Sequence, residues 1–173
     1  DGNAAAFTTT IEGPFGSGLY AAGFLLNNEL TDFSFRPEDA DGRPVANRVE
    51  AGKRPRSSMS PTIVFDEKGE VAAVLGSPGG SRIILFVTKA LIGLIDWQLD
   101  AQAAIDLPNF GSTGRAFELE YGWSTIWRAL ILKSYGHEIA PDLRNSGLHI
   151  VSMGNGVLEG GADPRREGAA LGD

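Results

Sequence analysis

Apolar and polar positions along the chain predict strands at both ends and helices in between. Residues 4–11 are rich in small and β-branched side chains, which predicts a strand. Residues 23–30, with sequence GFLLNNEL, predict a short buried strand that runs into a polar turn. Residues 35–55 show little periodicity and are rich in Pro, Asp and Arg, so we expect a surface loop there.

Two β-hairpins are predicted from apolar segments that flank turn residues. Residues 62–77 (TIVFDEKGEVAAVLGS) place Glu67, Lys68 and Gly69 between two apolar strands. Residues 148–163 (LHIVSMGNGVLEGGAD) contain Asn155-Gly156, a dipeptide that strongly favours a tight hairpin turn. A further strand is expected at AFELEYG, residues 116–122.

Helical spacing of apolar residues predicts three helices. The first covers residues 82–97, where apolar residues recur at helical spacing at Ile84, Val87, Leu91 and Ile95. A second should begin after Asp100, a good N-cap, and end by Pro108. The third covers residues 122–135, and its apolar face is expected to belong to the core; this face is formed by Trp123, Ile126, Trp127, Leu130 and Ile131. Strands that are followed by helices and then by mixed elements indicate an α+β fold.

Composition excludes several classes of function. The net charge is −7, and the one short basic run, Lys53-Arg54, is too small to neutralise a nucleic-acid backbone. Without cysteine the chain has no disulfide, thiol nucleophile or zinc–thiolate site. No uninterrupted apolar run reaches the roughly 18 residues of a membrane span.

The sequence opens on Asp1-Gly2, a turn signature without a preceding strand, so we expect an additional strand upstream.

Two segments are suited to binding an anion. Ser57-Ser58 follow a basic segment and precede a predicted strand, while GSPGGSRI, residues 76–83, is a glycine-rich turn before a predicted helix. Backbone N–H groups at a helix N-terminus favour negative charge, including the oxyanion of acyl transfer. A polar loop and a tight strand-to-helix connection are the structural alternatives. A nucleotide phosphate loop is excluded because no Lys precedes a Ser or Thr at the required position.

Candidate acidic and basic groups are few. Glu29 and Asp32 lie three residues apart beside apolar neighbours, so they form either a solvated turn or a partly buried site for a cation such as a ligand ammonium. His137 and His149 lie in or beside predicted strands, and we interpret both as structural. No Ser-His-Asp arrangement and no metal-ligand spacing is evident, and no cofactor is expected.

Several of these stretches together resemble the small, C-terminal subunit of the γ-glutamyltranspeptidases, which are N-terminal-nucleophile hydrolases. The resemblance extends over residues 1–173 in family order, and RPRSSMSPT followed by GSPGGSR is its most specific part. The matching stretches are DGNAAAFTTTIEGPFGSG, LLNNELTDFS, KRPRSSMSPTIV, GSPGGSRI and GGADPRREGAALGD.

The resemblance implies roles for individual residues. Ser57 and Ser58 would bind the α-carboxylate of a γ-glutamyl group, and the backbone N–H groups of Gly79 and Gly80 would form the oxyanion hole. The carboxylates of Glu29 and Asp32 would bind the substrate α-amino group. Thr10, in the first predicted strand, would hydrogen-bond the nucleophile.

Two departures from the family pattern matter. The family nucleophile is a threonine that becomes the N-terminus of the subunit after self-cleavage, and its free amine serves as the base. In this protein the nucleophile would lie upstream of Asp1, because Thr8, Thr9 and Thr10 are inside the chain and have no free α-amine. The alternative is that the chain is an inactive relative of the family. In addition, Glu12 replaces an asparagine that helps to bind the α-amino group in better-known members.

The resemblance also implies a fold, a partner and a reaction. The fold would be a four-layer αββα sandwich, of which this chain forms part, completed by a large N-terminal subunit cut from the same precursor. The reaction would be hydrolysis or transfer of γ-glutamyl groups from small molecules such as glutathione, through a threonine acyl-enzyme. A periplasmic or secreted location would follow. A glutaryl-cephalosporin acylase and a non-catalytic binding protein are the alternative functions.

Overall fold

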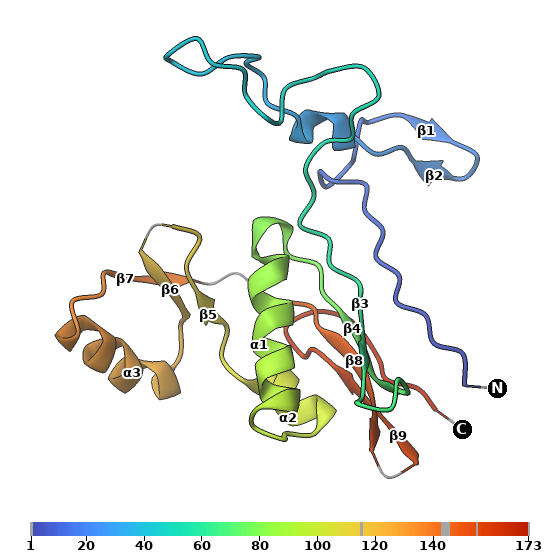
Figure 1. Cartoon of the computed structure of the whole chain (residues 1–173), viewed down its shortest axis with the longest axis vertical. Coiled ribbons are helices and arrows are strands. Elements are labelled where there is room, and N and C mark those ends of the chain that lie inside the picture. The colour runs from blue at the N-terminus through green and yellow to red at the C-terminus, as the bar shows by residue number, and fades with distance from the viewer. Residues whose placement is uncertain (1, 115, 143–145, 155, 173) are drawn as a thin grey trace. The chain divides into compact units, whose positions relative to one another are not determined.

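A computed structural model describes residues 2–114, 116–142, 146–154 and 156–172. The chain divides into two compact units, which we describe separately: residues 9–57 form the smaller unit, and residues 1–8 with 58–173 form the larger. The elements of both are labelled in Figure 1.

The larger unit is built on a four-stranded antiparallel sheet in the order β3-β4-β8-β9, formed by β3 (Thr62–Phe65), β4 (Val71–Gly76), β8 (His149–Gly154) and β9 (Val157–Ala162). Both predicted hairpins are confirmed. The first turns because the Asp66 carboxylate accepts hydrogen bonds from the backbone N–H groups of Lys68 and Glu70, at 2.8 and 2.9 Å. In the second, Asn155 lies outside the described residues.

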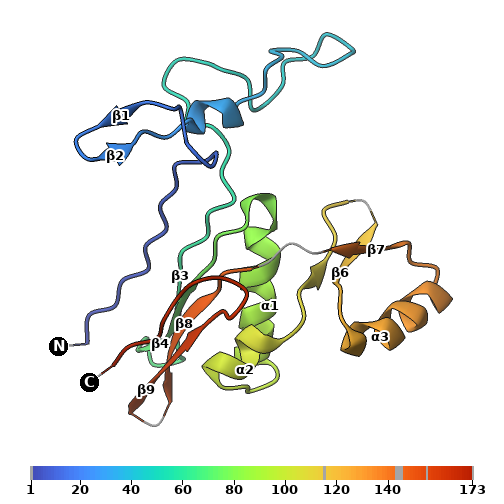
Figure 2. The same cartoon turned by 180° about the vertical axis from the view of Figure 1, so that it is seen from behind.

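Helices α1 (Ile83–Ile95) and α2 (Ala101–Asp106) pack on one face of this sheet (Figure 2). The Asp100 side chain caps α2 as predicted, accepting a 2.7 Å hydrogen bond from the Ala103 N–H. The helix predicted for residues 82–97 is confirmed by α1, but two of the residues at helical spacing, Ile84 and Ile95, are each 53% exposed. Nearly all of α1 is apolar, so sequence periodicity could not identify the side that faces the sheet. The core consists of Leu75, Ile83, Phe86, Val87, Ala90, Ala101, Ala104, Ile105, Leu148 and Ile150.

The opposite face of the four-stranded sheet is apolar and exposed. Side chains alternate between the faces of a strand, so Ile150 points into the core while its neighbour Val151 does not. Ile63, Val74 and Val151 are paired across three adjacent strands. We call this surface the outer sheet face; its exposed members are Ile63, Phe65, Val151, Met153 and Leu158.

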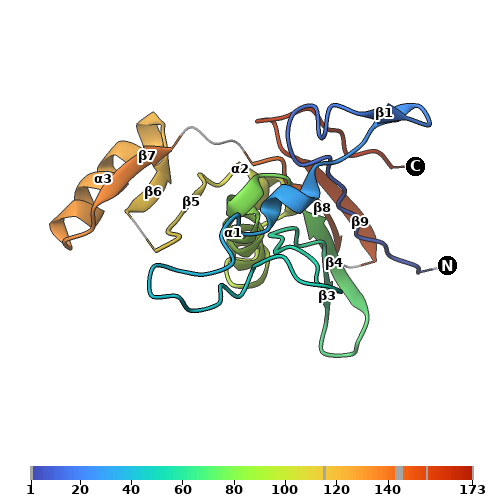
Figure 3. The same cartoon turned by 90° about the horizontal axis from the view of Figure 1, so that it is seen from above.

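A second, three-stranded sheet lies on the other side of α1 (Figure 3). It contains β5 (Phe110–Gly111), β6 (Phe117–Glu120) and β7 (Ile139–Asp142), and α3 (Trp123–Ser134) connects the parallel strands β6 and β7. The helix is where the sequence predicts it, but its apolar face is not in a core. Trp123 is 90% and Trp127 74% exposed, because this face has no partner among the described residues.

The smaller unit has little regular structure. A two-residue hairpin, β1 (Tyr20–Ala21) with β2 (Phe24–Leu25), precedes a short 3₁₀ helix, Glu29–Asp32. Residues 35–55 form the expected loop, which is closed by isolated bridges such as Glu38 to Pro44.

Two predicted strands are wrong. Residues 4–11 belong to no strand among the described residues, because no described segment forms a ladder of hydrogen bonds with them. The segment 23–30 contributes only the two residues of β2, and Phe24 is 59% exposed rather than buried. In the described part of the chain, no helix combines the length and the apolar character needed to cross a membrane.

Buried charged groups connect the chain end to the core of the larger unit. Asp163 is 2% exposed and accepts hydrogen bonds from the Ser146 hydroxyl and from the N–H groups of Leu148 and Arg165, the last two at 3.1 and 3.0 Å. The Arg165 guanidinium forms an ion pair with Glu120 and donates to the carbonyl groups of Ile105 and Leu107 at the C-terminal end of α2.

Lys89 shares the same two carbonyl groups. Its Nζ donates to Ile105 O at 2.9 Å and to Leu107 O at 2.8 Å, and the residue is 2% exposed. Burial, together with the nearby Arg165 charge, lowers the pKa of Lys89 to about 8. Two cations therefore satisfy the carbonyl groups at the C-terminal end of α2.

Replacement of Asp163 should destabilise the protein in a pH-dependent way. Burial alone would raise the pKa of Asp163, but hydrogen bonds from Ser146, Arg165 and Leu148 outweigh it and hold the pKa below its usual value. The carboxylate therefore stabilises the fold above the pKa that Asp163 has in the unfolded chain, and this contribution is lost as the pH falls through the lower pKa of the folded state. We expect Asp163→Asn to lower the free energy of unfolding at pH 7 by about 2 kcal/mol or more.

Denaturant titrations from pH 3 to 7 measure this difference. Asp41→Asn is the matched control, because Asp41 forms an ion pair with Arg43 at the surface, where both side chains are more than 60% exposed. Its effect should stay below about 0.5 kcal/mol. Equal effects of the two substitutions, or no pH dependence for Asp163→Asn, would contradict a stabilising role for the buried carboxylate.

Candidate functional site

Three carboxylates converge in the smaller unit. Oxygen atoms of Glu12, Glu29 and Asp32 all lie within 4.8 Å of one another. The sequence pattern identified Glu29 and Asp32 as a pair, whereas Glu12 was assigned only through the family resemblance. We call these three residues the carboxylate cluster.

Local hydrogen bonds explain how Glu12 reaches the other two acids. Asn28 lies directly before Glu29, and its side-chain Oδ1 accepts a 2.8 Å hydrogen bond from the Gly13 N–H. Its backbone N–H donates to Ile11 O at 3.2 Å. Asn28 therefore fastens the segment around Glu12 to the start of the 3₁₀ helix. Glu12 has a positive φ of 67°, and its N–H donates to the Thr10 hydroxyl at 2.8 Å.

The electrostatics of the cluster favour a cation. Burial, followed by the charges of Glu12 and Asp32, raises the pKa of Glu29 above its usual value. Glu29 Oε2 is buried and has no hydrogen-bond partner in the described structure. A positive ligand group would supply this missing partner and relieve the mutual repulsion of the carboxylates. An ammonium group or a metal ion could occupy such a site.

The glycine turn lies in the larger unit between β4 and α1. Gly79 and Gly80 have φ angles of 141° and 56°, values that side-chain-bearing residues rarely adopt. A Cβ atom on Gly79 would lie 2.5 Å from the Phe86 ring, so only glycine fits at this position. Gly80 begins a short 3₁₀ turn, Gly80–Arg82, that continues into α1. Both N–H groups thus belong to a turn that immediately precedes a helix.

The paired serines lie where the chain passes from one unit to the other. Ser57 is the last residue of the smaller unit and is exposed, while Ser58 is the first of the second segment of the larger unit and is partly buried. The Ser58 carbonyl accepts a 2.9 Å hydrogen bond from the Ser60 hydroxyl, and Met59 packs against the core. The backbone on the Ser58 side is therefore anchored.

Sequence reasoning missed one ion pair beside the glycine turn. Arg82 ends the turn, and its guanidinium contacts both carboxylate oxygens of Glu118 in β6. The two residues are 36 positions apart, so no spacing pattern could have related them. The histidines are exposed: the His149 ring lies 3.2 Å from Gly147 O, and the His137 ring is 6.2 Å from that of Phe117.

Comparisons with known proteins agree on one family. A sequence model of gamma-glutamyltranspeptidase matches residues 1–173. The glutathione hydrolase proenzyme of Escherichia coli K12 is 39% identical over 174 residues, which cover 95% of this chain and 30% of that protein. The Bacillus subtilis 168 proenzyme is 36% identical, and the match covers 99% of this chain and 29% of that protein. The chain thus spans about 30% of the length of these curated relatives.

Solved structures show the same relationship. A mutant of Helicobacter pylori γ-glutamyltranspeptidase superposes with a TM-score of 0.82 at 35% identity, and 95% of each chain is covered. The Pseudomonas nitroreducens enzyme complexed with L-DON gives 0.82 at 32% identity, with 99% of this chain and 94% of that chain covered. Cephalosporin acylase from Bacillus halodurans superposes with a TM-score of 0.71 at 26% identity, and the match covers 87% of this chain and 28% of that chain. The chain belongs to the γ-glutamyltranspeptidase family and has the α+β fold of that family's solved structures.

Proposed function

We propose that the protein containing this chain hydrolyses or transfers γ-glutamyl groups of amides such as glutathione. The observation that carries the proposal is the carboxylate cluster, because three converging acids suit the α-ammonium group of a γ-glutamyl donor. The names of the relatives, glutathione hydrolase proenzymes, support the same substrate class. A glutaryl acylase fits less well, since a glutaryl group lacks the ammonium and would leave Glu29 Oε2 without a partner.

The remaining candidate residues are assigned to the other groups of the donor. Ser57 and Ser58 bind its α-carboxylate through their hydroxyls. The N–H groups of Gly79 and Gly80 stabilise the oxyanion that forms when the nucleophile attacks the γ-carbonyl. Collapse of the oxyanion breaks the amide bond, the donor's amine leaves with a proton, and the γ-glutamyl group of the resulting acyl-enzyme is then transferred to water or to an acceptor amine. These groups act on opposite charges of the substrate, which fixes its orientation.

We assign the nucleophile to a threonine in the part of the protein that precedes Asp1. Its free α-amine serves as the base after self-cleavage, and Thr10 hydrogen-bonds the threonine hydroxyl. This chain is then the small, C-terminal subunit of the enzyme. The proenzyme names of the relatives support cleavage of a precursor.

A large subunit from the same precursor is the proposed partner. The outer sheet face supports this assignment, since Phe65 and Leu158 are 59% and 66% exposed and a second sheet would cover such a surface. It would complete the four-layer αββα sandwich. The family resemblance further supports a periplasmic or secreted location, which fractionation of the native cells would test.

The complete protein should release the aniline from a γ-glutamyl anilide, and residues 1–173 alone should not. The chain alone would lack both nucleophile and base, so no acyl-enzyme can form. Absorbance of the released aniline measures turnover, and EDTA should leave it unchanged if the cluster binds an ammonium group rather than a metal. Turnover by residues 1–173 alone would contradict the assignment of the nucleophile.

The donor should need its ammonium group. We expect kcat/KM for a γ-glutamyl anilide to exceed that for the glutaryl anilide by about 10²-fold. Glu29→Gln should lower the γ-glutamyl value at least about 10-fold and spare the glutaryl value, whereas the exposed control Glu38→Gln should change neither.

Because the pKa of Glu29 is raised, KM for the γ-glutamyl donor should fall as the pH rises through that pKa, while KM for the glutaryl donor should stay constant. Equal use of both donors would favour the acylase function.

Loss of both serine hydroxyls should weaken binding of the substrate carboxylate. Hydrogen bonds to a charged group contribute about 1.5–3 kcal/mol each, so Ser57→Ala with Ser58→Ala should reduce kcat/KM at least about 10-fold. Ser124→Ala, an exposed serine of α3, is the matched control. Steady-state kinetics with the γ-glutamyl anilide measures the effect. A double variant as active as wild type would show that the pair is only a structural turn.

A further inference from the structure

We propose that Glu118 is a positioning residue for the oxyanion hole, acting through its ion pair with Arg82. The inference rests on the proposed function, because it concerns the same Gly79 and Gly80 N–H groups. An oxyanion hole requires donors held about 2.7–3.1 Å from the developing charge. The question is what holds these two donors.

The glycine turn has little rigidity of its own. Two successive glycines allow more backbone conformations than any other pair, and both adopt positive φ angles here. Within the turn, the Arg82 N–H donates to Gly79 O at 3.1 Å. One backbone hydrogen bond contributes only about 1 kcal/mol, which is a weak restraint for a catalytic loop. Contacts from outside the turn must therefore fix it.

Contacts on its N-terminal side come from Ser77 and Phe86. The Ser77 hydroxyl donates to Pro78 O at 2.7 Å and accepts from the Gly147 N–H at 3.2 Å. The Phe86 ring fills the space beside Gly79 where a Cβ would otherwise lie. These contacts fix the start of the turn but leave Gly80 and Ser81, both exposed, to be held from the other end.

The Arg82–Glu118 pair supplies that second anchor. Arg82 Nε and Nη2 donate to separate carboxylate oxygens of Glu118, which is the bidentate geometry that fixes a guanidinium in direction as well as distance. The Arg82 and Glu118 side chains are only 12% and 18% exposed. Arg82 Nη1 also donates to the Ser81 hydroxyl at 3.0 Å, so the same guanidinium holds the residue after Gly80.

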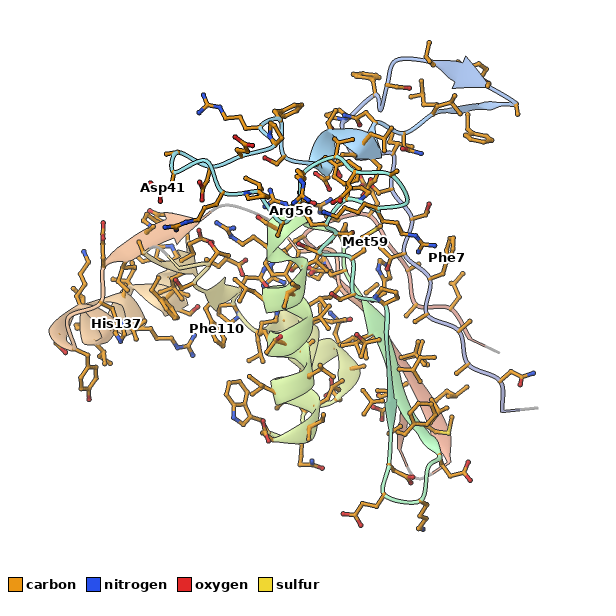
Figure 4. All side chains as sticks on the ribbon, turned by 45° about the horizontal axis from the view of Figure 1, so that its top comes forward. Phe7, Asp41, Arg56, Met59, Phe110 and His137 are labelled. Carbon is orange, nitrogen blue, oxygen red and sulfur yellow. The ribbon has the colours of Figure 1, made fainter. Side chains whose placement is uncertain are left out.

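The strand that carries Glu118 is itself well fixed. Glu118 lies opposite Gly111 of β5 and Ala140 of β7, at the centre of the three-stranded sheet. Next to it, Phe117 stacks on Phe110 with ring centroids 6.3 Å apart; Phe110 and His137 are labelled in Figure 4. Two residues further along β6, on the same face, Glu120 forms an ion pair with Arg165. Glu118 thus transmits the rigidity of a sheet to the glycine turn.

The test compares three variants of the complete, processed enzyme. Glu118→Gln keeps the shape but removes the charge, Arg82→Lys keeps the charge but removes the bidentate fork, and Glu138→Gln is the control. Glu138 is an exposed acid just before β7, in the same part of the fold. Concentrations are normalised to the amount of cleaved small subunit, so that a processing defect is not counted as slow chemistry.

The measurements separate positioning from a general structural effect. A displaced oxyanion hole lowers kcat, because the oxyanion exists only in the transition state, and leaves KM for the donor unchanged. We expect kcat to fall about 10-fold or more in Glu118→Gln and less in Arg82→Lys. The affinity of Glu118→Gln for a boronic-acid analogue, which forms a tetrahedral adduct, should fall by the same factor as kcat. Free glutamate, which forms no such adduct, should inhibit wild type and Glu118→Gln equally. Hydrogen exchange of residues 77–82 should be faster in Glu118→Gln than in wild type.

The outcomes are distinguishable. If wild type is active but Glu118→Gln matches Glu138→Gln in kcat, boronate affinity and exchange, the positioning role is wrong and the proposed function stands. A lower kcat with unchanged boronate affinity and exchange overturns it as well, since the defect then lies elsewhere. If Glu118→Gln does not fold, Arg82→Lys gives the same comparison. Wild type without γ-glutamyl turnover overturns the proposed function and, with it, the assigned role of Glu118.

Discussion

The buried carboxylate of Asp163 is the group on which the larger unit most depends. It accepts hydrogen bonds from the strand β8 region through Ser146 and Leu148, and it holds Arg165 against Glu120 and the end of α2. Removing one partner of such a network leaves other buried charges uncompensated, which costs far more than the loss of a surface ion pair. The central sheet, the helical layer and the second sheet are all connected through this one side chain and its immediate partners.

Charge in the smaller unit has the opposite character. The carboxylate cluster brings three like charges together without a cation among the described residues, so it costs stability where the Asp163 network contributes it. Clusters of like charge with a perturbed pKa are found more often at functional sites than elsewhere. The two acidic sites of one chain therefore differ in purpose: one is satisfied internally, and the other, as we propose, is completed by a substrate.

Sequence predicts those elements whose determinants are local. The hairpin at Asp66 and the cap at Asp100 depend on side chains within four residues of the bonds that they make. The sequence predicts α1 but not its orientation, because an almost wholly apolar helix does not show which side faces a sheet. Residues 4–11 were expected as a strand because composition cannot show whether a neighbouring strand is available. At the site, the spacing of Glu29 and Asp32 was visible, but their meeting with Glu12 depends on Asn28, and the Arg82–Glu118 pair depends on tertiary structure alone.

The smaller unit contains a single buried apolar side chain, Phe33, among its described residues. A segment of this size without a hydrophobic core lies at the low end of local stability, where opening costs little free energy. Any ligand that binds only the closed form adds stability in proportion to the logarithm of its concentration over its dissociation constant. A ligand in the carboxylate cluster would then lengthen the time that residues 9–57 survive a protease, so the lifetime of this part of the protein would follow the supply of that ligand.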